Sequence, residues 1–139
     1  MPPKPIRVRV KKIVMDPQQR CLVILGTPKR DVPIWIGAAE GQAIALKLEG
    51  KTMPRPMTHD LFVNALSQTG WGIEKLVISD LRETTFYGEL HLRSGSKRTV
   101  LDCRPSDGIA LALRTKAPLY IAPHIFDLVS APSPSSPSP

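Results

Sequence analysis

The chain has 139 residues, 42% of them apolar, which is enough to bury a core in one compact domain. Lysine and arginine outnumber aspartate and glutamate by 19 to 12, and the resulting net charge of +7 favours anionic partners such as nucleic acid, phosphorylated ligands or an anionic membrane. No run reaches the roughly 18 apolar residues of a membrane span and the N-terminus lacks a signal-like apolar segment, so we expect a cytoplasmic protein without a membrane-spanning segment.

The first predicted elements are strands. Apolar and basic residues alternate over residues 6–11, which predicts a strand with one apolar and one basic face. The alternation slips at Lys12, which predicts a bulge or bend. Two short buried strands follow at 21–26 and 32–37, and the Ala- and Leu-rich segment 38–50 predicts a largely buried helix.

A second helix is predicted from Thr58 to about Gln68, with a core stripe of Leu61, Phe62, Ala65 and Leu66.

The mixed order of elements and an evident hairpin favour an α+β fold: a single domain, residues 1–129, with a largely antiparallel mixed sheet and three to four helices packed on it. Residues 130–139, rich in proline and serine, predict a disordered tail. The remaining predicted elements are strands at 73–82, 85–94 and 96–103, a helix at 106–117, a short strand at 118–122 and a turn of helix at 124–129.

The hairpin around "SGSK" predicts its own register. Two carboxylates, Glu89 and Asp102, then lie directly across the sheet and repel unless a cation or a shared proton lies between them. They are therefore a candidate metal or acid pair, although another loop, solvent exposure, or nearby Arg98 and Arg104 would remove the tension. The predicted pairs are Leu90 with Leu101 and Gly88 with Cys103 on the apolar face, and His91 with Val100 and Glu89 with Asp102 on the other.

Two arginine-proline corners precede the second and third helices. "RPMTHD", residues 55–60, and "RPSD", residues 104–107, each run from an arginine through a proline to a hydroxyl residue and an aspartate. The proline restricts the arginine to extended backbone, and each helix start offers unpaired N–H groups and the positive end of the helix dipole. A guanidinium at such a place adds a bidentate contact, so the two corners predict phosphate binding.

A structural explanation of the same corners stays open. Thr58 and Ser106 are ordinary N-cap residue types, and an aspartate in a first helical turn stabilises the dipole by about 0.3–1 kcal/mol without any ligand. Helical phase places His59 at the edge of the core stripe and Asp60 almost opposite it. We therefore expect His59 in a half-sheltered site, whereas Asp60 needs a neighbouring chain or segment to enclose it.

Several common chemistries are excluded by missing motifs. The sequence has no Walker loop, dinucleotide-binding turn, nucleophile elbow or HExxH motif, and its aromatic residues form no base-stacking pattern. Cys21 and Cys103 are too few for a disulfide scaffold and lack zinc-site spacing, so we expect buried thiols. The remaining acid, histidine and arginine residues suit phosphodiester hydrolysis, in which carboxylates hold a divalent ion, a histidine moves a proton and arginine offsets charge on phosphate.

Three segments in order, "PIWIGAAEGQAIALKLEG", "PRPMTHDL" and "DCRPSDGIALALR", closely resemble the bifunctional nuclease family, small bacterial and plant domains named for activity on DNA and RNA. The resemblance spans about residues 6–128. Gly41 and Gly108 stand where the family usually has alanine, from which we expect looser helices. Family members form oligomers, which implies that assembly encloses Asp60. The family positions matched here are Glu40, Arg55, Thr58, His59, Asp60, Asp102, Arg104, Ser106 and Asp107.

Together, the residues and the resemblance predict a nuclease that hydrolyses phosphodiester bonds of DNA and RNA with broad specificity, assisted by Mg²⁺ or Mn²⁺. Nucleic acid is the predicted partner, and a homo-oligomer the predicted assembly. Two other classes stay open: a non-catalytic nucleic-acid- or phosphate-binding regulatory module, and a structural assembly protein. The predicted roles are catalysis by Glu40, His59, Asp60 and Asp107, substrate binding by Arg55, Thr58, Arg104 and Ser106, and metal coordination by Glu40, Asp60 and Asp102.

Overall fold

Seven strands form one mixed sheet in the order β3-β2-β1-β7-β4-β5-β6, in which every neighbouring pair except β7 and β4 is antiparallel. The computed structural model describes residues 3–130, and the predicted tail from residue 131 onward lies outside them. The strands are β1 (Ile6–Met15), β2 (Cys21–Gly26), β3 (Asp31–Ile36), β4 (Gly72–Arg82), β5 (Thr85–Ser94), β6 (Lys97–Cys103) and β7 (Leu119–Ile121). The helices are α1 (Ala38–Leu48), α2 (Thr58–Gln68), α3 (Pro105–Thr115) and α4 (Pro123–Ser130).

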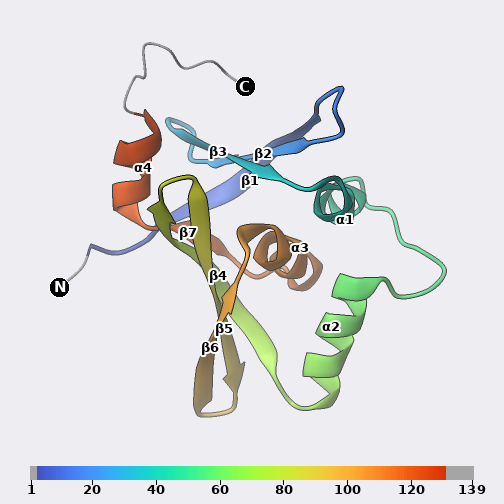
Figure 1. Cartoon of the computed structure of the whole chain (residues 1–139). Helices are drawn as coiled ribbons and strands as arrows, with labels where there is room; N and C mark the ends of the chain where they lie inside the picture. Colours follow the sequence, from blue (N-terminus) through green and yellow to red (C-terminus); the bar gives the residue numbers. More distant parts are fainter. Residues whose placement is uncertain (1–2, 131–139) are drawn as a thin grey trace.

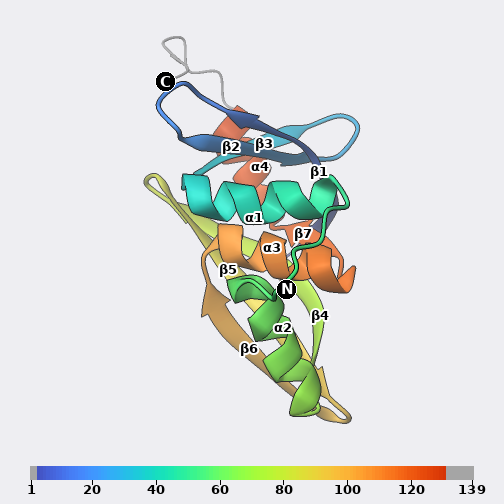
Figure 2. The same ribbon diagram turned by 90° about the vertical axis from the view of Figure 1, so that its right-hand side faces the viewer.

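The α+β architecture confirms the prediction. Figure 1 shows α1, α3 and α2 on one side of the strands, with α4 at the end of the sheet near β3. In Figure 2 these three helices follow one another across the molecule, with α3 in the middle. No helix among residues 3–130 is long and apolar enough to cross a bilayer. The central position of α3 matters for the site, because α3 contacts both α1 and α2.

Two local predictions about the strands are confirmed. The register of β1 against β2 shifts between Val10 and Lys12, where the alternation of the sequence slips. The β5–β6 hairpin has the predicted register, with Leu90 opposite Leu101 and Glu89 opposite Asp102. Because neighbouring side chains of a strand point to opposite faces, Asp102 lies on the face away from the buried Leu90.

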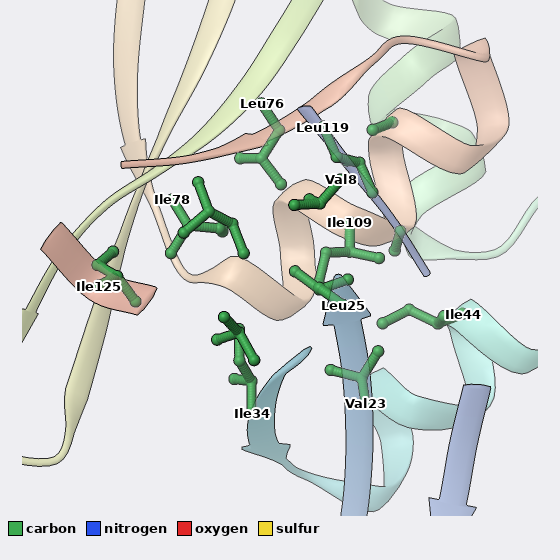
Figure 3. Close-up of a cluster of buried hydrophobic side chains, with 14 of the residues drawn as sticks. Val8, Val23, Leu25, Ile34, Ile44, Leu76, Ile78, Ile109, Leu119 and Ile125 are labelled. Carbon is green, nitrogen blue, oxygen red and sulfur yellow. The ribbon is translucent and has the colours of Figure 1, made fainter. Parts of the chain in front are cut away.

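The main core lies between the sheet and the helices α1, α3 and α4. Apolar strand residues alternate with exposed ones, so that one sheet face is covered. A smaller cluster of Leu90, Leu92 and Leu111 lies beneath α2 and contacts Val63 and Leu66. The labelled side chains in Figure 3 converge on the main core: Val8, Val23, Leu25, Ile34, Ile44, Leu76, Ile78, Ile109, Leu119 and Ile125.

The predicted core stripe of α2 is wrong in its rotation. Leu61 is 62% exposed and Phe62 40% exposed, and Ala65 is exposed too. The helix instead faces inward through His59, Val63 and Leu66, which are spaced four and three residues apart. Contacts of His59 and Asp60 with α3 fix this rotation. The periodicity of apolar residues gives no information about such polar contacts.

Two other helix predictions need correction. The expectation that α1 is largely buried is wrong, because only Gly41, Ala43 and Ile44 are buried while Leu48 is 45% exposed. As the end member of the row of helices, α1 packs chiefly against one other helix, α3, and on β2 and β1 through a single face. The terminal helix is longer than the single turn predicted, running from Pro123 to Ser130, and its Ile125 and Phe126 are buried.

Gly41 and Gly108 allow close packing of their helices. A Cβ atom at Gly108 would overlap the Cδ1 atom of the buried Leu76 on β4. A Cβ atom at Gly41 would lie 2.7 Å from the Cβ atom of the buried Cys21 on β2. These glycines bring α1 and α3 close against the sheet, where an alanine would not fit without a shift of its neighbours.

Gly41→Ala is expected to lower the free energy of unfolding. Overpacking costs about 1–3 kcal/mol, and the better helix preference of alanine offsets about 1 kcal/mol, which leaves a net loss of up to about 2 kcal/mol. Urea denaturation measures the change. The control is Gly72→Ala, where an added Cβ would meet nothing within 4 Å. If Gly41→Ala unfolds at the same urea concentration as this control, the contact between α1 and Cys21 is not too close for a Cβ atom, and the packing argument is contradicted.

Candidate functional site

The two arginine-proline corners meet at Asp107. The Nε2 atom of His59 on α2 lies 3.0 Å from Oδ1 of Asp107 on α3. Arg104, directly before α3, donates from Nε to Oδ2 at 2.9 Å and from Nη2 to Oδ1 at 3.1 Å. The structure therefore brings His59, Arg104 and Asp107 together although 48 residues separate the histidine from its aspartate.

The hydrogen bond to Asp107 determines which nitrogen of His59 is available. An ionised carboxylate only accepts hydrogen bonds, so Nε2 carries the proton and Nδ1 of the neutral ring keeps its lone pair. Burial alone would raise the pKa of Asp107, but hydrogen bonds from Arg104 and His59 outweigh it and hold the pKa below its ordinary value. The His59 side chain is 16% exposed, so this arrangement is sheltered but still reached by solvent.

Glu40 lies near Arg104. A hollow of about 290 Å³ between the first turns of α1 and α3 is lined by Glu40, Arg104 and the buried Ser106. The hydrogen bond to Asp107 is the main cause of the raised pKa of Arg104, and Glu40 adds a smaller electrostatic contribution. Three of the predicted site residues, Glu40, Arg104 and Ser106, thus line the same hollow.

The predicted N-cap roles of Thr58 and Ser106 are wrong. Met57 and Arg104 occupy the N-cap positions, so α2 begins at Thr58 itself and α3 begins one residue before Ser106. Neither N-cap residue makes a side-chain capping hydrogen bond. The proline at the start of α3 needs no hydrogen-bond partner for its nitrogen, which explains why that helix can begin before Ser106.

Asp60 faces away from the His59–Asp107 pair. Its Oδ2 accepts a hydrogen bond from the Met57 N–H at 2.9 Å, and its Oδ1 accepts one from Arg114 Nε at 2.6 Å. The Met57 N–H is the largest cause of the lowered pKa of Asp60, and Arg114 adds to it against the opposing effect of burial. The segment that encloses Asp60 is therefore α3 of the same chain.

Arg114 is the important residue that the sequence reasoning missed. Its side chain is 4% exposed. Besides Asp60, it donates to the Ala110 carbonyl at 2.9 Å and to the Ala43 carbonyl at 3.3 Å, so that it joins α1, α2 and α3. A signal was present, because Arg114 follows Asp107 by seven residues and so lies on the same face of α3.

The other predicted residues lie apart from this cluster. Arg55 and Thr58 are exposed, and Arg55 lies in the segment 49–56, in which every residue is exposed. Asp102 is exposed on the opposite face of the sheet. Its cross-strand neighbour Glu89 accepts a hydrogen bond from His91 at 3.1 Å. Solvent exposure and a histidine therefore relieve the expected repulsion between the two carboxylates.

The residues proposed as metal ligands do not form a common site within the chain. Glu40 lies beside Arg104, Asp60 is held by Arg114, and Asp102 is on the far sheet face. Across residues 3–130 there is no group of three or more histidine, cysteine, aspartate or glutamate side chains that could hold a metal ion. The donor set thus does not fit Mg²⁺ or Mn²⁺ in the predicted way.

Comparison with known proteins identifies the family. The sequence profile of the bifunctional nuclease domain matches residues 23–134. The chain is 40% identical over 117 residues to the "Uncharacterized protein MT1877" of Mycobacterium tuberculosis (strain CDC 1551 / Oshkosh), over 82% of this chain and 70% of that protein. The "Uncharacterized protein Rv1829" of strain ATCC 25618 / H37Rv matches to the same extent. The chain therefore belongs to the bifunctional nuclease domain family, a nuclease-like family.

Proposed function

We propose that the protein is a nuclease that hydrolyses phosphodiester bonds of DNA and RNA with broad specificity. The observation that carries this proposal is the contact between His59, Asp107 and Arg104, which joins the two arginine-proline corners. It places an imidazole N–H and a guanidinium on one carboxylate, and it leaves the second ring nitrogen of His59 able to accept a proton. This combination suits a reaction that moves protons and builds negative charge on phosphate.

In the proposed reaction, water is the nucleophile. DNA lacks the 2′-hydroxyl group, so one mechanism for both nucleic acids requires an external attacking oxygen. His59 Nδ1 takes a proton from the water as its oxygen bonds to phosphorus, the bond to the leaving oxygen breaks, and the imidazolium or solvent returns a proton to that oxygen. Asp107 stabilises the imidazolium through the Nε2–H contact.

Arg104 is the proposed phosphate contact. Two of its guanidinium N–H groups donate to Asp107, and its side chain is 66% exposed. A guanidinium has five N–H donors, so others remain to bind phosphate oxygens. Glu40 lines the adjacent hollow, where a carboxylate can orient the attacking water. Because the donor set does not fit a metal within the chain, no step of this mechanism passes through Mg²⁺ or Mn²⁺.

A non-catalytic nucleic-acid- or phosphate-binding regulatory or assembly module is the second candidate. The observation that favours it is that both oxygens of Asp107 already accept hydrogen bonds from the chain itself. The His59–Asp107 contact holds α2 against α3, and this structural role explains the contact without any catalytic activity. In this case the exposed guanidinium binds phosphate without hydrolysing the ester.

Cleavage assays with purified protein test the proposal. Single- and double-stranded DNA and RNA are each incubated with Mg²⁺, with Mn²⁺ and with a chelator. Hydrolysis of both nucleic acids is expected, and activity that persists in the chelator agrees with the metal-free mechanism. Binding of the same substrates without any cleavage would contradict the nuclease proposal and favour the second candidate.

A further inference from the structure

A basic hollow lies on the Asp60 side of the first turn of α2. Its volume is about 340 Å³, and its charged lining consists of Lys47, Lys51 and Arg114 with only one carboxylate, Asp60. We propose that this hollow is a second phosphate site, which binds the backbone of the nucleic-acid strand whose ester is cleaved at His59. The inference rests on the proposed function and adds a second point of contact for the same substrate.

The two lysines supply the positive charge that is not neutralised. Asp60 already balances Arg114 at 2.6 Å. Lys47 is close enough to contribute to the lowered pKa of Asp60, after the larger contributions of the Met57 N–H and Arg114. Among residues 3–130, Lys51 pairs only with the exposed Glu49 at 3.3 Å, an arrangement that contributes little in water. Two lysines therefore line a hollow large enough for a phosphate group.

The walls of the hollow also provide neutral hydrogen-bond donors. The side chains of Thr52 and Asn64 belong to its lining, together with apolar residues of the segment 49–57. A phosphate group accepts hydrogen bonds from hydroxyl and amide groups as well as from ammonium groups. Contacts to phosphate oxygens carry no sequence information directly, so a phosphate site in this hollow agrees with broad specificity.

The position of the hollow fits a continuous strand. Asp107 and Arg114 lie seven residues apart on α3, which is about 10 Å along a helix. Asp107 contacts His59 and Arg114 contacts Asp60, so the two sites lie on either side of the first turn of α2. At 3.4 Å of rise per nucleotide, about 10 Å corresponds to about three nucleotides of a B-form strand.

The test is binding of a short, labelled single-stranded oligodeoxynucleotide to the full chain, measured by fluorescence anisotropy across a range of salt concentrations. Loss of two phosphate contacts should lower the slope of log affinity against log salt by about 1.4 and weaken binding about 10- to 30-fold at 0.1 M salt. The test variant is the double substitution Lys47→Ala and Lys51→Ala. Its charge-preserving counterpart, Lys47→Arg with Lys51→Arg, should keep the slope.

A matched control removes the same charge elsewhere. Lys29, between β2 and β3, and Lys97, at the start of β6, are exposed, and neither has an ion pair within residues 3–130. The variant with alanine at both positions therefore tests the general effect of lost charge. An equal effect of both double alanine variants would overturn the proposal, as would unchanged binding by the Lys47/Lys51 variant. Displacement of the strand by inorganic phosphate at the same phosphate concentration would also overturn it, because the hollow would then be a site for free phosphate.

The same experiment separates this inference from the nuclease proposal. If the native chain binds the strand but cleaves no nucleic acid, the nuclease proposal fails. Specific loss of binding in the Lys47/Lys51 variant would still support a phosphate site in the hollow. If the native chain cleaves nucleic acid but this variant binds the strand as tightly as the native chain does, the nuclease proposal stands and the proposal of a second phosphate site fails.

Discussion

His59→Ala is expected to lower kcat/KM for both DNA and RNA by about 10²- to 10⁴-fold, the usual contribution of a general acid or base. The substitution removes the proposed proton acceptor while Arg104 keeps its two hydrogen bonds to Asp107. The protein should therefore stay folded, which circular dichroism checks. Initial rates with one DNA and one RNA substrate measure the loss.

A second histidine provides the matched control. His124 also contacts an aspartate, with 3.1 Å between its Nε2 and Oδ1 of Asp80, but it lies on α4 away from the proposed site. His124→Ala should keep native rates. If His59→Ala keeps them too, the activity belongs to another site or to a contaminant.

The pH dependence of hydrolysis adds a constraint. The pKa of Asp107 lies below the ordinary value of about 3.9 for aspartate, so this carboxylate stays ionised until the solution is strongly acidic. A fall in rate that begins above about pH 5 therefore cannot come from protonation of Asp107. Initial rates measured from about pH 8 down to about pH 4 locate the fall, and a loss of rate confined to the range below about pH 4 would instead agree with protonation of this carboxylate.

The local elements of the fold follow from the sequence because their signals are local. The turn at Gly95 fixes the β5–β6 register, and the slip at Lys12 marks the bulge of β1. The repeated arginine-proline pattern at two helix starts is also visible in the sequence. It does not specify that His59 contacts Asp107, a contact that depends on how α2 packs against α3.

The rotation of α2 could not be predicted in this way. Apolar periodicity favoured Leu61 and Phe62 as the buried face, but the contacts of His59 and Asp60 with α3 turn these apolar residues outward. Both contacts cross about fifty residues of sequence, and their geometry depends on how α3 sits on the sheet. Helix propensity and periodicity say nothing about partners at that distance.

The predicted metal site depended on the same missing information. The carboxylates of Asp60 and Asp102 were chosen by residue type and family position, which do not specify direction. Asp60 turns toward Arg114, and Asp102 turns to the uncovered face of its strand. In the structure, Asp60 is the ion-pair partner of the buried Arg114 on α3. The sequence analysis did not consider this arginine and therefore assigned Asp60 to a metal site.

Asp60→Ala is expected to lower the free energy of unfolding by about 3 kcal/mol at pH 7. Removal of one member of a buried ion pair typically costs 3–5 kcal/mol, and we take about the low end of that range because Asp60 is 29% exposed. The substitution leaves Arg114, 4% exposed, without a counterion. Urea denaturation measures the change. The exposed pair of Arg30 and Asp127 is the control, since Asp127→Ala should cost at most about 1 kcal/mol.

The sign of the pH effect follows from the lowered pKa of Asp60. Its contribution to stability is fully present above the unfolded-state pKa of about 3.9 and is lost as the pH falls through the lower folded-state pKa. The unfolding free energies of the native chain and of Asp60→Ala should therefore differ most near neutral pH and converge below about pH 4. A difference that grows on acidification would contradict this assignment.

A double-mutant cycle separates the structural role of Asp60 from a catalytic one. Arg114→Met removes the buried cation, so adding it to Asp60→Ala should recover part of the lost stability, because no unpaired charge remains inside. Hydrolysis should recover together with the fold if Asp60 only holds the helices. If the double variant is stable yet inactive while Arg114→Met alone is active, the carboxylate of Asp60 takes part in the reaction itself.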